Sequence, residues 1–151
     1  MLARLKAVVA LATLAMPTIT GAEPIVPVGE DPLSDATFTL TPPPAATIKR
    51  QEGPDFFVYR ITWGEGGALS LYEGCCPQTV LRDATKQGVS INGLAGELAV
   101  AQACDTISKE WHIKNPQGQY QLIVHAWYSN LSPADAAVAD AAVATIKPKP
   151  R

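Results

Sequence analysis

Residues 56–72 read FFVYRITWGEGGALSLY, and this stretch predicts the fold class most directly. Its first part, Phe56 to Trp63, is rich in β-branched and aromatic residues, which is typical of a buried strand. The glycine-rich run at 64–67 turns the chain, and Ala68 to Tyr72 returns as a second strand. We therefore predict a β-hairpin here, and a sharp end to the second strand at Gly74-Cys75-Cys76-Pro77.

A second hairpin is predicted from strands at 108–114 (SKEWHIK) and 119–128 (QYQLIVHAWY). The intervening residues, Asn115-Pro116-Gln117-Gly118, suit a type I turn followed by a bulged glycine. Both faces of the longer strand are apolar, so we expect this strand to be central in its sheet.

That turn would also set the register of the second hairpin, pairing Trp111 with Ile123. Because side chains alternate along a strand, one face would then carry Trp111, Ile113, Ile123, His125 and Trp127. His112 would lie on the other face, where Glu110 could pair with it at the surface. We interpret His125 as a packed core residue. Two histidines on opposite faces should not share a metal ion, and we expect no metal site.

The C-terminal part of the chain predicts a helix. Ser132 is a suitable N-cap, Pro133 occupies the first helical position, and Asp135 suits the positive end of the helix. Small and apolar residues recur at helical spacing: Ala134, Ala137, Val138, Ala141, Thr145 and Ile146. Pro148 and Pro150 end the helix. This stripe of small residues should let the helix lie close to a sheet.

The remaining segments give weaker signals. We predict strands at 36–41, 89–91 and 97–104, and a polar loop at 45–55. Residues 78–88 are ambiguous between a loop and a short helix. Together the elements predict an α+β fold, in which an antiparallel sheet of four to six strands carries the C-terminal helix packed on one face.

The N-terminus has the pattern of a secretory signal peptide. Arg4 and Lys6 precede an apolar run at 7–16 that is too short to span a bilayer, and small residues at 20–22 suit cleavage. We therefore expect a signal peptide at 1–22, an extended proline-rich arm at 23–35, a single domain at 36–147 and a tail at 148–151. Export would place the mature protein in the periplasm.

The charge of the mature chain limits its partners. Removal of Arg4 and Lys6 with the leader leaves 10 basic against 14 acidic side chains, a net charge of about −4. Without a cluster of lysines and arginines we expect no nucleic-acid partner, because phosphate neutralisation needs a basic patch. A second apolar stretch of bilayer length is also absent, so we expect no stable membrane insertion after cleavage.

Three cysteines, Cys75, Cys76 and Cys104, would enter an oxidising compartment. We expect one disulfide between Cys104 and either member of the adjacent pair, which would leave one thiol over. A direct Cys75–Cys76 ring ranks behind both of these pairings. A metal or reactive-thiol role is less favoured, since adjacent cysteines lack the spacing of zinc knuckles.

Catalytic motifs are not evident. The serines lack a nucleophile elbow, no carboxylate pair is marked for acid–base chemistry, and the glycine-rich stretches lack a phosphate-loop lysine. We therefore expect a protein that is not an enzyme, with no catalytic residue and no cofactor. If the protein were an enzyme, ionisable groups would converge in a cleft, most usefully His125 with a carboxylate.

The segment 72–78, YEGCCPQ, is the strongest candidate for a binding surface. A proline and a disulfide would make it a rigid turn, and rigid turns bind with little loss of conformational entropy. The expected partner-binding residues are Tyr72, Glu73, Gly74, Pro77 and Gln78.

The runs Phe57–Arg60, Leu71–Gly74, Trp111–Ile113 and His125–Tyr128 resemble small exported proteobacterial proteins. Across about residues 56–147 the arrangement is similar to PsbP-like α/β domains and to periplasmic immunity proteins, although Cys75-Cys76 departs from the pattern. The resemblance implies a periplasmic protein that binds another protein, as an immunity protein or inhibitor of a secreted or cell-wall-directed enzyme. Mild acidity would suit a basic target. The alternative is a periplasmic accessory or small-ligand-binding domain.

Overall fold

The computed structural model describes residues 31–114 and 123–150. The predicted signal peptide, the first part of the arm and the turn at 115–118 lie outside this range. The strands are β1 (Phe38–Thr39), β2 (Thr47–Glu52), β3 (Phe56–Trp63), β4 (Gly67–Gly74), β5 (Lys86–Ile91), β6 (Leu94–Ala103), β7 (Thr106–Lys114), β8 (Ile123–Leu131) and β9 (Lys147–Pro148), and the helix is α1 (Pro133–Val143).

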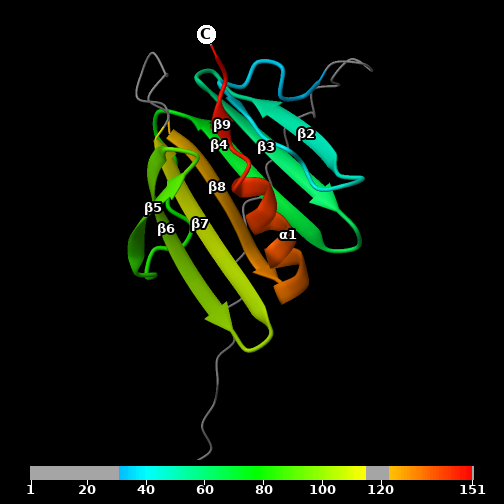
Figure 1. The fold of residues 1–151 in the computed structure, drawn as a ribbon, viewed down its shortest axis with the longest axis vertical. Helices are drawn as coiled ribbons and strands as arrows, with labels where there is room; N and C mark the ends of the chain where they lie inside the picture. The colour runs from blue at the N-terminus through cyan, green and yellow to red at the C-terminus, as the bar shows by residue number, and fades with distance from the viewer. Residues whose placement is uncertain (1–30, 115–122, 151) are drawn as a thin grey trace, which may run out of the picture.

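Within the described residues, seven strands form one antiparallel sheet in the order β2-β3-β4-β8-β7-β6-β5. The α+β class is confirmed, but the expected four to six strands were too few. β8 lies fourth of seven, so its predicted central position is confirmed. The strands β1 and β9 form a separate two-stranded sheet beside the C-terminus (Figure 1). The described part of the chain holds no helix with the length and apolar character needed to cross a membrane.

The first predicted hairpin is confirmed, with β3 and β4 paired along their full length. One additional strand, β2, occupies the segment predicted as a loop. Its half-buried side chains, Ile48 and Arg50, alternate with exposed ones, and it pairs only with β3. A polar, charged strand of this kind is suited to a sheet edge, where charges discourage pairing with other chains. The polarity that suggested a loop is the property of an edge strand.

The register of the second hairpin differs from the prediction. Trp111 lies opposite Ala126, three residues further along the chain than the predicted Ile123. Because three is an odd number, the shift exchanges the faces of one strand relative to the other. His112 therefore lies directly opposite His125, on the same face of the sheet, and the prediction that the histidines are separated was wrong.

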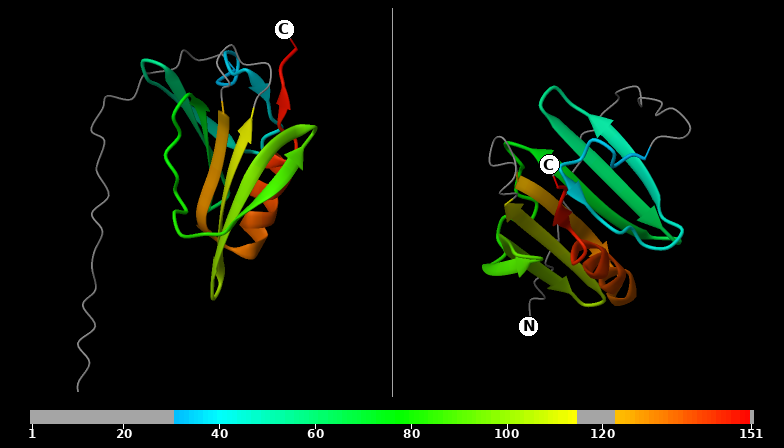
Figure 2. Two further views of the ribbon diagram at one scale, coloured as in Figure 1. Left: turned by 90° about the vertical axis from the view of Figure 1, so that its left-hand side faces the viewer. Right: turned by 45° about the horizontal axis from the view of Figure 1, so that its top comes forward.

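The helix α1 covers one face of the sheet, and the segment 75–85 crosses the other (Figure 2, left). The predicted cap is confirmed: the Ser132 hydroxyl accepts from the backbone N–H of Asp135, and Pro133 begins the helix. The predicted packing stripe was wrong except at Ile146, because the buried residues are Ala136, Ala139, Ala142, Val143 and Ile146. The sequence PADAAVADAAV is small or apolar nearly all round, so spacing alone does not identify the face that packs.

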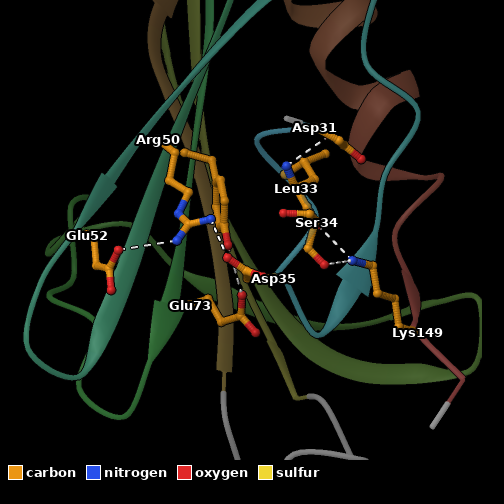
Figure 3. Close-up of polar contacts among 9 residues, drawn as sticks. Asp31, Leu33, Ser34, Asp35, Arg50, Glu52, Glu73 and Lys149 are labelled. Atoms are coloured by element: carbon orange, nitrogen blue, oxygen red, sulfur yellow. Dashed lines mark hydrogen bonds and ion pairs between the residues drawn. The ribbon is translucent and has the colours of Figure 1, made fainter. Parts of the chain in front are cut away.

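The segment before β1 is part of the packed structure rather than an extended arm, as far as residues 31–35 are described. Leu33 is buried in the core, and Asp35 accepts an ion-paired hydrogen bond of 2.6 Å from Arg50 (Figure 3). The ammonium group of Lys149 donates to the carbonyls of Leu33 and Ser34. The predicted tail is thus also held, through β9 and Lys149.

Candidate functional site

Glu110 lies on β7, on the face of the sheet opposite α1, and is 2% exposed. Its two carboxylate oxygens accept from the backbone N–H groups of Val80 (2.9 Å) and Leu81 (2.7 Å). Those residues belong to the segment 75–85, which links β4 to β5 across the outer face. The crossing segment therefore buries the carboxylate and supplies two of the hydrogen bonds that a buried charge requires.

The two histidines converge on the same carboxylate. The Nε2 atoms of His112 and His125 lie 3.0 Å and 2.9 Å from Oε1 of Glu110. Since an ionised carboxylate oxygen only accepts, both Nε2 atoms carry the proton in this arrangement. The imidazole rings meet edge to face with centroids 4.6 Å apart, and His125 stacks on Trp127 at the same centroid distance. Trp127 thus packs against a face of the His125 ring.

Burial and hydrogen bonding set the protonation states of the cluster. Burial, and to a smaller extent the neighbouring His112, lower the pKa of His125 to about 4. Burial works to raise the pKa of Glu110, but the backbone N–H groups of Leu81 and Val80 and the contact with His112 outweigh it, so the pKa is lowered. At neutral pH the site therefore holds a carboxylate beside a neutral His125 imidazole.

One side of the cluster opens to solvent. The side chain of His112 is 17% exposed. A shallow surface hollow beside it is lined by Lys86, Glu97, Ala99, Glu110 and His112. Lys86 and Glu97 form an exposed ion pair with N···O 3.6 Å at its rim. Position 96 on β6 requires glycine, because a Cβ there would lie 2.6 Å from the backbone oxygen of His112. The absence of a side chain thus lets β6 approach β7 closely at this point.

Glu110, His112 and His125 offer three ligand atoms that all lie within 4.8 Å of one another. Two imidazoles and one carboxylate form a donor set that suits zinc and other first-row transition metals. The spacing of Glu110 and His112, two residues apart on one strand, places them on one face. The sequence was enough to identify Glu110 and His112 as neighbours. Whether His125 joins them depended on the register of β8.

The predicted partner-binding residues divide into buried and exposed groups. Glu73 is 3% exposed, and its carboxylate accepts from the backbone N–H of Thr37 (2.8 Å), from the Thr37 hydroxyl and from the hydroxyl of Tyr59. Its assignment as a surface carboxylate is therefore corrected. Gly74 is also buried. Tyr72 and Pro77 are half-buried, and Gln78 is exposed.

The predicted long-range disulfide does not fit the topology. Gly74, just before the cysteine pair, lies opposite Ile123 at one end of the sheet. Cys104 lies in the turn between β6 and β7, at the other end, where Ile107 pairs with Leu131. The length of β8 separates the two positions, well beyond the roughly 7 Å that a disulfide can bridge between Cα atoms. All three cysteines are free and exposed.

Comparisons with protein-family models, with curated proteins and with solved structures found no significant match for this chain. The function must therefore be argued from the site itself.

Proposed function

We propose that this protein is an exported, periplasmic metal-binding protein, and that Glu110, His112 and His125 hold a transition-metal ion such as Zn²⁺. The convergence of both imidazole Nε2 atoms on one carboxylate oxygen carries the proposal. The N-terminal sequence supports export, since it has the charge, apolar length and small residues of a cleavable signal.

The ligand states favour binding at neutral pH. A metal ion requires deprotonated ligands, and the site combines an ionised carboxylate with a neutral buried imidazole. Ligand atoms about 2.0–2.1 Å from a tetrahedral ion lie roughly 3.3 Å apart. The present O···N distances of 2.9 Å and 3.0 Å need to lengthen by only a few tenths of an ångström. The ion would replace the two Nε2 protons and shift both rings to the Nδ1–H form.

The surroundings are those expected to orient metal ligands. The backbone N–H groups of Val80 and Leu81 hold the Glu110 carboxylate, and such outer contacts commonly change metal affinity by about 10–100-fold. Three protein ligands leave a fourth position, and water would occupy it on the partly exposed side of His112.

Metal titration of the mature chain, residues 23–151 without a histidine tag, tests the proposal. We expect one Zn²⁺ per chain by calorimetry, and Co²⁺ should produce visible absorption of a four-coordinate site. His112→Gln should weaken binding by at least about 100-fold, whereas Glu97→Gln, on the rim of the same hollow, should change affinity by less than about 10-fold.

Thiols offer a competing set of ligands, so the titration is repeated with Cys75, Cys76 and Cys104 all changed to serine. Unchanged stoichiometry in this variant is expected. The proposal is overturned if no stoichiometric metal binds at micromolar concentration, if His112→Gln binds as tightly as the parent chain, or if the serine variant loses the ion.

The exposed turn after β4 supports a second candidate function, the binding of a protein such as a basic secreted enzyme. Cys75, Cys76 and Gln78 are exposed there, while Pro77 restricts the backbone. Affinity capture from envelope extracts should recover a stoichiometric partner that Gln78→Arg loses and that Glu65→Arg, in the β3–β4 turn, retains. Recovery of the same partner by both variants would rule out this surface.

A further inference from the structure

The adjacent cysteines after β4 form a pair of thiols that the metal site does not use. Both side chains are exposed, and their Sγ atoms lie 2.8 Å apart. The topology removes Cys104 as a partner, because it lies at the opposite end of the sheet. Among the described cysteines, Cys75 and Cys76 are therefore each other's available partner within the chain.

The position of the pair makes it accessible to a disulfide in solution. β4 ends at Gly74, so the thiols lie outside the ladder of hydrogen bonds, and Pro77 prevents the strand from continuing. On one side Cys75 faces Asp55, with Sγ 3.9 Å from a carboxylate oxygen. Gly74 is confined more tightly, because a Cβ there would lie 2.6 Å from the hydroxyl of Tyr72. A held strand end thus presents two adjacent, solvent-exposed thiols.

We propose that Cys75 and Cys76 are a redox-active pair whose substrate is a disulfide, and which closes to an eight-membered disulfide ring. The thiolate of one cysteine attacks a sulfur of the substrate disulfide, forms a mixed disulfide and releases one thiolate. The second cysteine loses its proton and attacks the protein sulfur of the mixed disulfide, releasing the other thiolate. The pair is oxidised by two electrons, the substrate disulfide is reduced to two thiols, and the two protons end on those thiols.

The redox pair is independent of the proposed metal site, because it includes neither Glu110 nor the histidines. It also differs from a structural disulfide, which would join distant strands and resist exchange. A ring between neighbours closes almost no additional chain, so it restricts the unfolded state little. It should therefore open and close with the thiol–disulfide balance of its surroundings.

Tryptic digestion separates the pair from the third cysteine. Cleavage after Arg60 and Arg82 yields one peptide, 61–82, which contains both adjacent cysteines, whereas cleavage after Lys86 and Lys109 places Cys104 in the peptide 87–109. An intramolecular ring therefore leaves peptide 61–82 lighter by two hydrogen atoms, and a long-range bridge joins the two peptides. Mass spectrometry distinguishes these products without prior assignment of the disulfide.

The folded mature protein is equilibrated with buffers of increasing ratio of oxidised to reduced glutathione, alkylated, digested and weighed. As the ratio rises, we expect the doubly alkylated form of peptide 61–82 to be replaced by the form with the closed ring. At intermediate ratios Cys104 should still be alkylated. Cys104→Ser should leave this transition unchanged, whereas Cys75→Ser should instead gain one glutathionyl group at Cys76. The proposal is overturned by double alkylation of 61–82 in fully oxidised buffer, by a stable glutathione adduct without a ring, or by linkage to 87–109.

Discussion

The two faces of strands β7 and β8 differ in what they bury and in how it is covered. Toward α1 the strands present Trp111, Ile113, Val124, Ala126 and Tyr128, all buried among apolar neighbours. Toward the segment 75–85 the same strands present Glu110, His112, His125 and Trp127. An apolar side chain is buried by any close-packed neighbour, whereas a carboxylate needs donors aimed at it.

The contrast explains why the two coverings are built differently. The helix contributes small side chains such as Ala139. It is also linked to the sheet by Asp140, whose carboxylate accepts hydrogen bonds from Lys109 and from the hydroxyl of Tyr128. The crossing segment contributes backbone N–H groups instead. We infer that the apolar face toward α1 supplies stability, whereas the polar face gives up some stability to form the proposed binding site.

The largest effect should come from breaking the apolar face. Leu71→Ala removes a side chain with no exposed surface on β4 and should lower the free energy of unfolding by about 2–5 kcal/mol. Urea denaturation measures this loss, with Val138→Ala, at 37% exposure on the helix surface, as the matched control. Zn²⁺ affinity of the folded protein should stay the same. A parallel fall in affinity would show that the faces are not independent.

Breaking the polar face should cost nearly as much but should alter binding as well. The substitution Glu110→Leu introduces a side chain of similar size but leaves the N–H groups of Val80 and Leu81 without their acceptor. Each buried donor without an acceptor costs about 1–3 kcal/mol of stability. We expect a loss of about 3 kcal/mol in urea, together with loss of the metal ion. Glu97→Gln, which is exposed, should change stability by no more than about 0.5 kcal/mol.

Acidification should sharpen the comparison, because both histidines of the chain lie on the polar face. In the folded protein the pKa of His125 is lowered from 6.5 to about 4, so the unfolded chain binds the proton first as the pH falls. The stability present above pH 6.5 should therefore decrease between pH 6.5 and 4, by about 3 kcal/mol.

Denaturation of the metal-free protein in chelator at a series of pH values measures this slope. His125→Gln should flatten the dependence over the same interval. An equally steep fall in that variant would assign the titration to other groups.

The smallest effect should come from the cap of α1. Ser132→Ala removes the hydroxyl that accepts from the backbone N–H of Asp135, and should cost about 1 kcal/mol. The midpoint of urea unfolding reports it, while metal affinity should be unaffected. Ser132→Asp preserves an acceptor at the same position and should restore most of the loss.

Much of the architecture follows from local pattern. The β-branched run at Phe56–Trp63, the glycine turn after it and the Ser132-Pro133 helix start each satisfy a short-range requirement that neighbouring residues express. The pattern failed where several structures satisfy it equally. An alanine-rich helix has no distinct apolar face, and a polar segment such as 47–52 is compatible with either a loop or an edge strand.

The sequence by itself therefore determined the hairpin of β3 and β4, where the helix begins, and that Glu110 and His112 share a face. Only the tertiary structure decided that His125 joins them, because a shift of three residues in the pairing of β7 with β8 changes its face. The same holds for the crossing segment, whose N–H groups reach Glu110 from about 30 positions earlier in the chain. Register and long-range hydrogen bonding depend on the whole sheet, which local sequence does not encode.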